Sequence, residues 1–330
     1  MVKKVSVLVA VHNSAQWLPR CFASLASQTY DNIEVVCVDD ASTDNSLQVL
    51  SEYAAKFAFL KVASLPRNSG PAVARNEAFR LSTGDYIMML DSDDWLSSDA
   101  IEKAVVVLDS YDDTASVLFD MVYHDAETGN ERPFASKSTQ DVLDGRDAMR
   151  MALDWDIHGL YLARRHLYEK YPFDTAAFLY SDDNTARRHY LHSGKVRFCD
   201  GIYYYFQRPS SLMHNPGVHY ADWMEATASL KRMLVEEGES DKYINHIEAR
   251  LWQNIVAVCG YYWRYGKALS PVERASLLGR IESHHAAIEL RRLPLALKCK
   301  FGFIPFKRFF GLFMLQERLY FYLRKLVKGI

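Results

Sequence analysis

Three carboxylates crowd into four positions at residues 91–94. The sequence there reads Asp91-Ser92-Asp93-Asp94, directly after the apolar run YIMML. Like charges at this spacing repel one another, so the cluster is either a solvated turn with a helix cap or the site of a positive group. Hard divalent cations need oxygen ligands, and Mg²⁺ typically takes one or two carboxylates together with substrate phosphates. The residues alone therefore leave two readings open, a turn or a metal–diphosphate site.

The surrounding elements indicate where these acids lie. Apolar runs predict buried strands at 5–11, 33–38, 60–64 and 86–90, and residues at helical spacing separate them. This alternation predicts an α/β fold with parallel strands and right-handed crossovers. Ligands of such sheets bind outside the carboxyl ends of the strands. Four polar segments follow strand ends, at 12–14, 39–43, 66–70 and 91–94, so the acids are expected on a ligand-binding rim opposite Asp39 and Asp40.

Composition excludes several classes of protein. The chain has 330 residues, 49% of them hydrophobic, and a net charge of −2, which does not suit a nucleic-acid-binding protein. Its five cysteines are scattered, so a disulfide framework or a zinc site is not expected and a reducing compartment fits best. The glycine motifs of dinucleotide-binding and P-loop proteins are missing from the sequence.

The charge is uneven along the chain. Residues 291–330 hold ten Lys or Arg against one acid, Glu317, and this asymmetry predicts an anionic partner for the tail. The longest apolar run in this segment has seven residues, FFGLFML, against the ~20 needed to span a bilayer. The tail is therefore expected to lie on an anionic membrane surface, or else to pack as terminal helices or form a basic oligomer interface. The residues expected to enter the headgroup region are Phe309, Phe310, Phe313, Met314 and Tyr320, with Lys307, Arg308, Arg318, Arg324 and Lys325 meeting lipid charge.

Four segments in a fixed order carry a family resemblance. VSVLVAVHNS, DDASTDNS, NSGPAVARNEAF and GDYIMMLDSDDW resemble the nucleotide-binding half of the inverting family-two glycosyltransferases, which have the GT-A fold, a Rossmann-like and mostly parallel sheet flanked by helices. The resemblance covers roughly residues 4–110 and continues more thinly to about 214. It implies a GT-A domain at 1–215, with a nucleotide-sugar half at 1–110 and an acceptor and catalytic half at 111–215. A helical region at 216–290, for packing or oligomerisation, and the tail at 291–330 would follow.

The resemblance also assigns roles in donor binding. Ala10, His12 and Asp40 would line a uracil pocket, with His12 in place of the family's usual aromatic residue. Arg75 would face the phosphates or the sugar, and Asp93, with Asp91, would hold Mn²⁺ or Mg²⁺. His214 is a further candidate for the metal or the diphosphate. The nucleotide-sugar residues are thus Ala10, His12, Asn13, Asp40, Arg75, Asp91 and Asp93.

A second acid pair, Asp182-Asp183, resembles the segment in which the family places its catalytic base, and the position matches Asp183. The alternative is a helix start, because Asp is favoured at N-caps and in first turns. Trp155 and His158 fall where relatives build the acceptor site, although a core Trp fits equally well.

These parts together predict a metal-dependent inverting glycosyltransferase. It would move a sugar from a nucleotide donor, expected to be UDP-linked, to a glycan or lipid-linked acceptor in surface polysaccharide synthesis, on the cytoplasmic face of the membrane. Two alternatives remain at this point. One is a nucleotidyltransferase, and the other is a catalytically inactive sugar-nucleotide-binding partner that recruits another enzyme to the membrane.

Overall fold

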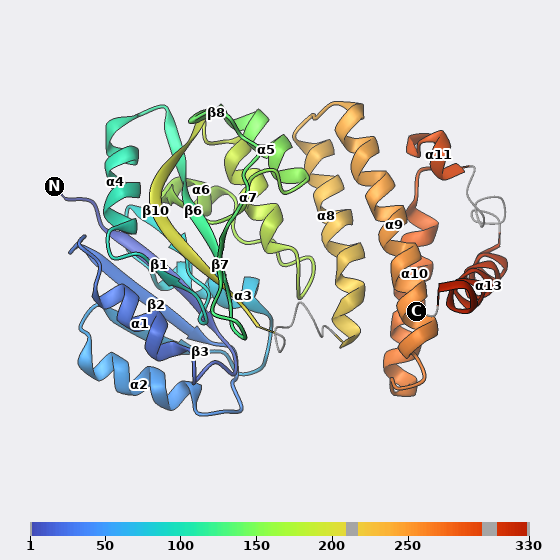
Figure 1. The fold of residues 1–330 in the computed structure, drawn as a ribbon, viewed down its shortest axis with the longest axis horizontal. Coiled ribbons are helices and arrows are strands. Elements are labelled where there is room, and N and C mark those ends of the chain that lie inside the picture. The colour runs from blue at the N-terminus through green and yellow to red at the C-terminus, as the bar shows by residue number, and fades with distance from the viewer. Residues whose placement is uncertain (1, 209–216, 299–308, 329–330) are drawn as a thin grey trace. The chain divides into compact units, whose positions relative to one another are not determined.

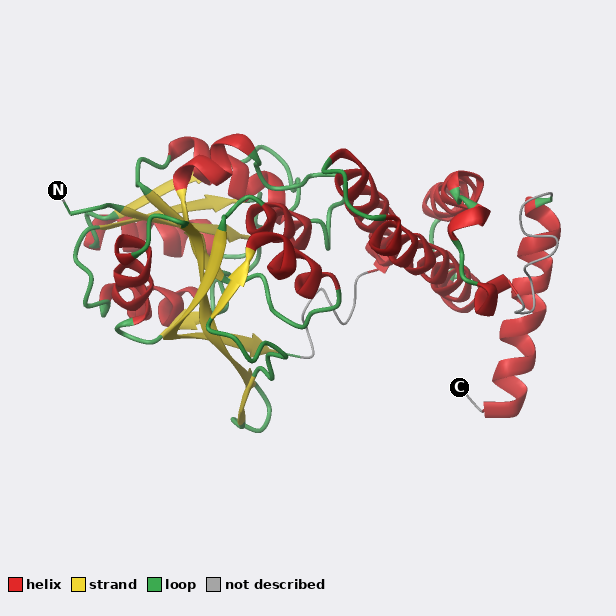
Figure 2. Cartoon of the chain, turned by 90° about the horizontal axis from the view of Figure 1, so that it is seen from above, coloured by secondary structure: helices red, strands yellow, loops and turns green. Residues whose placement is uncertain are grey.

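The chain divides into two compact units in a computed structural model that describes residues 2–208, 217–298 and 309–328. The first unit comprises residues 1–178 and 182–214, and the second comprises 179–181 and 215–330 (Figure 1). Strands occur in the first unit, whereas the described part of the second is helical (Figure 2). Within the described ranges, none of the helices combines the length and apolar character needed to cross a membrane.

The first unit is built on a ten-stranded sheet with the order β3-β2-β1-β4-β9-β6-β10-β5, and β7 and β8 pair with β6 and β10 at its margins. The strands are β1 (Val5–Val11), β2 (Ile33–Asp39), β3 (Leu60–Ser64), β4 (Tyr86–Met89), β5 (Trp95–Leu96), β6 (Thr114–Asp125), β7 (Glu131–Pro133), β8 (Val142–Asp144), β9 (Tyr161–Arg164) and β10 (Lys195–Gln207). The helices are α1 (Leu18–Ala26), α2 (Ser46–Lys56), α3 (Pro71–Leu81), α4 (Ala100–Ser110), α5 (Gly145–Leu153), α6 (Arg165–Lys170) and α7 (Asp182–Leu191).

The N-terminal half follows the predicted α/β pattern. Strands β1 to β4 are parallel, and most of their residues are buried because helices cover both faces of the sheet (Figure 1). The apolar stripe of α1, which includes Leu18, Phe22 and Leu25, is fully buried against this sheet. The predicted α/β fold is therefore confirmed, and so is the helical C-terminal extension.

The second half of the sheet is mixed in direction. β9 runs antiparallel to both of its neighbours, β4 and β6, whereas β10 is parallel to β6. Sequence alternation of strands and helices does not reveal this, because helix α5 precedes β9 and the alternation alone would suggest another parallel crossover. The arrangement brings the end of β10 beside β5, which directly follows the acids at 91–94.

The second unit has its own apolar core. Its elements are η1 (Gly217–Ala221), α8 (Asp222–Glu236), α9 (Asp241–Tyr265), α10 (Pro271–Ala287), η2 (Leu290–Arg292), α11 (Leu295–Lys298) and α13 (Phe310–Lys328). Residues of α9, α10 and α13 form the core, among them Trp252, Ile255, Ile281 and Phe313. Helix α10 begins with a capping box between Ser270 and Glu273, which satisfies its first backbone N–H groups.

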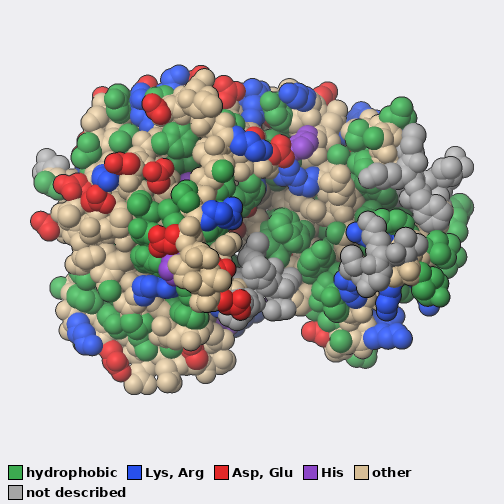
Figure 3. Space-filling model, in the orientation of Figure 1, with side chains coloured by type: hydrophobic (Ala, Val, Ile, Leu, Met, Phe, Trp, Pro, Cys, Tyr) green, Lys and Arg blue, Asp and Glu red, His purple; other side chains and the backbone are tan. Residues whose placement is uncertain are grey.

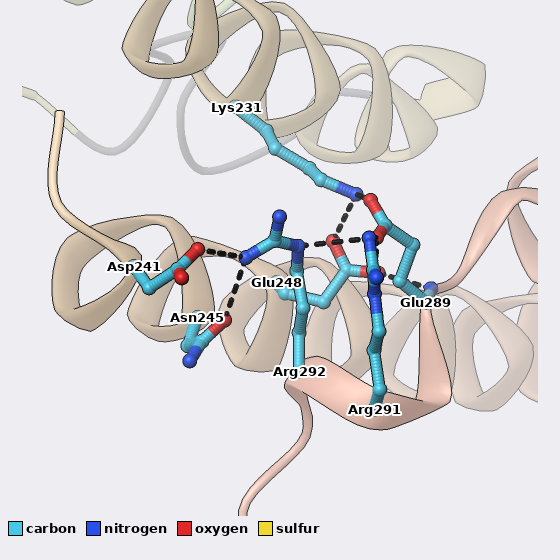
Figure 4. Close-up of polar contacts among 7 residues, drawn as sticks. All are labelled: Lys231, Asp241, Asn245, Glu248, Glu289, Arg291 and Arg292. Atoms are coloured by element: carbon cyan, nitrogen blue, oxygen red, sulfur yellow. Dashed lines mark hydrogen bonds and ion pairs between the residues drawn. The ribbon is translucent and has the colours of Figure 1, made fainter. Parts of the chain in front are cut away.

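A buried polar cluster fixes the segment after α10 to the preceding helices (Figure 4). Glu248 of α9 is fully buried, and the Lys231 ammonium of α8 lies 2.6 Å from its carboxylate and 2.8 Å from that of Glu289. Arg292 donates to Asp241 at 2.6 Å and to Asn245 at 3.1 Å. Because a buried carboxylate is costly without a positive partner, this cluster specifies where residues 289–292 must pack.

Candidate active site

The loop after β1 is held by a polar network around His12. The ring Nδ1 lies 2.8 Å from the carbonyl oxygen of Asp40, and Nε2 lies 3.2 Å and 3.1 Å from the amide nitrogens of Asn13 and Asn68. A carbonyl can only accept and an amide NH₂ can only donate, so Nδ1 carries the proton and Nε2 accepts. His12 is half-buried, and so is Ala10 at the end of β1.

Asn13 holds the loop after β2 through its side-chain oxygen, and its contact with a donor stays a prediction. Its side-chain oxygen accepts from the backbone N–H of Thr43 at 2.8 Å and of Asp44 at 3.3 Å. Its φ of 50° lies in the left-handed region, which Asn tolerates better than most residues. Asn13 thus joins the first two loops of the rim.

The acid pair after β2 is buried. Both carboxylate oxygens of Asp40 accept backbone N–H groups at 2.7 Å, one from Ser69 and one from Gly70 at the start of α3. This fixes the third loop to the second, and a contact of Asp40 with a nucleotide base stays a prediction. In Asp39, Oδ2 accepts from Ser42, whereas the buried Oδ1 has no hydrogen-bond partner among the described residues.

Asp94, the third acid of the carboxylate cluster, has a structural role. It is 2% exposed, and it accepts from the Tyr203 hydroxyl at 2.9 Å and the Phe206 backbone N–H at 2.7 Å. Burial, and then the charges of Asp93 and Asp91, raise its pKa well above the ordinary range. Asp94 therefore anchors β10 to the rim and is not available as a ligand.

Asp93 is neutralised from the end of β10. The guanidinium of Arg208 lies 2.9 Å from Asp93 Oδ2. Burial and the Asp91 charge raise the pKa of Asp93, and Arg208 opposes them. A second guanidinium, that of Arg20, donates to the Asp93 carbonyl at 2.8 Å and lies 3.9 Å from the ring centres of both Trp95 and Phe206.

Arg75 joins the two acidic segments of the site. Its side chain is 4% exposed, and its two terminal nitrogens lie 2.5 Å from Asp91 and 2.8 Å from Asp182. These two charges raise the pKa of Arg75 despite its burial. The end of β4 and the start of α7 are thus bridged by one guanidinium, while a direct contact of Arg75 with a donor remains a prediction.

Asp183 is a partly buried carboxylate with a raised pKa. Burial raises the pKa of Asp183 to about 6, and the charge of Asp182 adds to the increase. The positive charges of Arg187 and Arg75 oppose it, and so does a hydrogen bond with Trp155. Arg187 lies 3.8 Å from the carboxylate, and the Asp183 side chain is 32% exposed, so a substrate hydroxyl can approach it. A carboxylate with a pKa near the working pH both carries its charge and accepts a proton readily.

The two residues expected at the acceptor site differ in their positions. Trp155 is 46% exposed, bonds Asp183, and has a φ of 59°, a strained conformation of the kind found at functional sites. His158 is instead 5% exposed, its Nδ1 accepts the Leu160 N–H at 3.2 Å, and burial lowers its pKa to about 4. The structure corrects the expectation for His158, which is a neutral core histidine. His214 lies outside the described residues.

The remaining rim chemistry fits a divalent metal held partly by substrate. Asp91 and Asp93 present 33% and 19% of their side chains to solvent, on a rim where Asp94 is already occupied. The described residues contain no cluster of three or more His, Cys, Asp or Glu that could hold a metal. Two carboxylates plus phosphate oxygens and water would satisfy Mg²⁺ or Mn²⁺, so the donor set fits.

Sequence reasoning did not identify two residues that shape the site. Arg20 supplies charge to the acid cluster from α1, and Tyr203 bonds both Asp94 and the Asp91 N–H, at 2.9 and 3.1 Å. Only the register of β10 beside β5 identifies Tyr203. Nothing in the spacing around Arg20 indicates its role.

Comparisons with known proteins agree with this geometry. Residues 6–175 match the family profile "Glycosyl transferase family 2", just over half of the chain. Glycosyltransferase GlyG of Streptococcus pneumoniae is 27% identical over 230 residues, covering 64% of this chain and 74% of GlyG. Poly(ribitol-phosphate) beta-glucosyltransferase of Bacillus spizizenii is 40% identical over 101 residues, which are 30% of this chain and 16% of that enzyme.

The fold matches solved structures over nearly its full length. S. aureus TarS 1–349 in complex with UDP-GlcNAc gives a TM-score of 0.70 at 20% identity, covering 99% of this chain and 92% of that one. At this identity the likeness shows the fold alone. The family profile, the named relatives and the assembled rim lead to one conclusion: the chain belongs to glycosyl transferase family 2 and is a glycosyltransferase.

Proposed function

We propose that this enzyme transfers a sugar from a UDP-linked donor to a hydroxyl of a glycan or lipid-linked acceptor, with inversion at the anomeric carbon, in surface polysaccharide synthesis. The observation that carries the proposal is the Arg75 bridge. It connects Asp91 of the acidic rim to Asp182, whose neighbour Asp183 is the candidate base. The diphosphate site and the proton acceptor therefore lie on two segments held together by one side chain.

The comparisons support the choice of donor and acceptor. The solved TarS structures include complexes with UDP and with UDP-GlcNAc, and two relatives are named for transfer to poly(ribitol-phosphate). This chain has the same fold, and its rim offers Ala10, His12 and Asp40 around the expected base pocket. We extend the donor class to this chain and leave the individual sugar open.

Different residues carry out the separate parts of the reaction. Asp183 takes the proton of the acceptor hydroxyl as that oxygen attacks the anomeric carbon and the bond to the diphosphate breaks. Trp155 and Arg187 hold the Asp183 carboxylate in place. Asp93, with Asp91, would hold Mn²⁺ or Mg²⁺, which when bound acts as a Lewis acid toward the departing diphosphate. A single displacement with one base and no protein nucleophile inverts the configuration.

Arg208 has a place in this scheme. It pairs with Asp93 in the present structure, on the carboxylate proposed for the metal. A cation at Asp93 would compete with this guanidinium, which could then turn toward the negative diphosphate. The competing function, transfer of a nucleotidyl group, gains no support from the glycosyltransferase family match.

The test is donor affinity measured by calorimetry with and without Mn²⁺. Asp93→Ala should abolish the metal-dependent part of UDP-sugar binding because the diphosphate loses its counter-charge. Asp200→Ala is the matched control, since this acid has a side chain that is 77% exposed and lies away from the rim. Unchanged metal-dependent affinity in Asp93→Ala would remove the metal assignment. A panel of nucleotide sugars, screened by thermal stabilisation, would identify the donor.

We also propose that the enzyme works at the inner face of the membrane, where a lipid-linked acceptor is presented. The sequence supports this through the ten basic residues of the segment 291–330. The structure changes which residues can take part. Phe313 and Met314, expected to enter the headgroup region, are 0% and 7% exposed and belong to the helical core. Lys307 and Arg308 lie outside the described residues.

A further inference from the structure

Helix α13 (Phe310–Lys328) has two apolar faces instead of one. The inner face packs on α9. Phe313 and Trp252 have ring centres 5.7 Å apart, and the Met314 sulfur lies 3.7 Å from that of Cys259. The close approach depends on Gly260, where a Cβ would lie 2.6 Å from the Phe321 ring. This face orients α13 on the helical unit.

The other face points to solvent. It consists of Leu312, Leu315, Leu319, Tyr322, Leu323 and Leu326, whose exposed fractions run from 46% to 66%. At 3.6 residues per turn these six side chains fall within an arc of about 100°. Most single exposed leucines need no explanation, but a continuous stripe of this kind marks an interaction surface. We call these six residues the outward stripe.

Basic side chains flank the outward stripe. Arg318 and Lys325 lie along one edge of the stripe, whereas Arg324 falls within the arc of Phe313 and Glu317, near the end of the helix. All three are exposed, and the Arg318 guanidinium lies 5.4 Å from the ring centre of Trp263. None of the three has an ion-pair partner among the described side chains. The one acid of α13, Glu317, is 3% exposed and faces the core, so the solvent side of the helix carries only positive charge. Figure 3 shows hydrophobic side chains with Lys and Arg beside them where α13 reaches the surface.

We propose that the outward stripe of α13 is the surface by which the protein lies on an anionic lipid bilayer. Leucines and a tyrosine would enter the boundary between headgroups and acyl chains, while Arg318 and Lys325 along the edge of the stripe meet lipid phosphate. The helix would lie in the membrane plane, since it is not long and apolar enough to cross. The lipid-linked acceptor of the proposed function explains why the enzyme would bind a membrane, and in this respect the inference rests on that function. The membrane contact itself is inferred from the side chains of α13.

A second copy of the chain is the other occupant to consider. Leu312, Leu315, Leu319, Tyr322 and Leu326 follow the alternating spacing of three and four that coiled coils use. Such helices choose partners through opposite charges beside the seam, yet the exposed side of α13 offers no acid. The charge pattern therefore favours lipid phosphate over a second α13.

The test is co-sedimentation of the full chain with vesicles of phosphatidylcholine alone or with about a third phosphatidylglycerol. Binding is expected to the anionic vesicles and to weaken with salt. Arg318→Gln with Lys325→Gln should lower partitioning about 25-fold, since each basic residue near such a surface contributes about fivefold. Leu315→Glu with Leu319→Glu should lower it by about 100-fold, because two leucines no longer leave water.

The matched control is Val235→Glu with Val272→Glu. These valines lie in α8 and α10 and are 52% and 79% exposed, so the change in charge is the same, and the loss of apolar surface is similar, away from the outward stripe. The control should bind vesicles like the unaltered protein after allowance for its added charge. If the control and the α13 variant lose binding equally, or if neither loses it, the stripe is not the contact surface.

Two further measurements separate the remaining outcomes. Light scattering across a range of protein concentrations would reveal a dimer, and a dimer abolished by Leu315→Glu with Leu319→Glu, without vesicle binding, would overturn the lipid proposal. UDP-sugar binding is measured on the same samples. Donor binding that persists while vesicle binding fails rejects the membrane surface and leaves the proposed reaction standing, and the reverse result rejects only the reaction.

Discussion

The acid limb of the pH–rate profile should belong to Asp183. Its carboxylate has a pKa of about 6, raised by burial and by the charge of Asp182. A base must be deprotonated to work, so kcat/KM should be constant at neutral pH and fall on acidification. About one tenth of the base form remains at pH 5, and the rate should drop about tenfold for each further unit.

Two substitutions test the cause of this limb. Asp182→Asn removes the like charge beside the base and should move the limb to lower pH. Asp183→Asn keeps the size but cannot take a proton, so turnover should fall by about 100- to 10,000-fold with donor binding retained. Asp183→Asn should also stabilise the protein. The folded pKa exceeds the unfolded value, so the folded carboxyl lowers stability as pH rises from ~4 to ~6. With 32% of the side chain in water, the gain at pH 7 should be about 1 kcal/mol.

The assay is initial-rate kinetics at saturating metal, with UDP release measured from pH 5 to pH 9, together with thermal unfolding at pH 4 and pH 7. The unaltered enzyme sets the position of the limb, and Asp200→Ala serves as an acid-to-neutral control on the surface. A limb that stays in place in Asp182→Asn would show that the Asp182 charge does not set it. Less than a tenfold loss in Asp183→Asn would show that Asp183 only starts helix α7 and that the proton goes elsewhere.

Other predictions concern the bridge, the helical unit and the product. Arg75→Lys keeps the charge but cannot bridge Asp91 and Asp182 with one planar group. The value of kcat should therefore fall by about ten- to 100-fold, and the unfolding free energy should drop by about 1–3 kcal/mol. Kinetics and urea unfolding measure the two effects, and full activity would mean that the bridge is not used. Burial raises the pKa of Glu317 to about 7, so this group lowers stability as pH rises from ~4 to ~7. Glu317→Gln should therefore raise the unfolding temperature at pH 8 and leave it unchanged at pH 4, and an equal shift at both would refute the titration. The anomeric coupling in proton NMR should show inversion between donor and product, whereas retention would contradict a single displacement.

The sequence predicted the N-terminal half of the fold well because each element there carries a local signal. The apolar run of β1 and the proline that begins α3 both appear where the residues indicate. The antiparallel β9 has no such signal, since strand direction depends on long-range pairing. Its four residues, Tyr161–Arg164, look the same whichever way they pair.

The candidate site shows the same division between local and long-range information. The motif positions of Asp91, Asp93 and Asp183 could be assigned from the chain alone, but their partners could not. Arg75 is 107 positions from Asp182, and Arg208 is 115 from Asp93. His158 could not be separated from a surface histidine by its neighbours, because only the packing of β9 and α7 decides its burial. The orientation of α13 was likewise undetermined while both of its faces were apolar.

The Arg75 bridge constrains how this enzyme can be recombined with others. Arg75 lies in the half expected to bind the donor, and Asp182 lies in the half expected to bind the acceptor. A chimera that exchanges only residues 1–110 keeps the bridge only if the incoming segment has an arginine in the same place on its third helix. Without it, two carboxylates would face each other with no cation between them. Donor specificity should therefore be exchanged through the rim loops alone, with α3 and the start of α7 kept from the same parent.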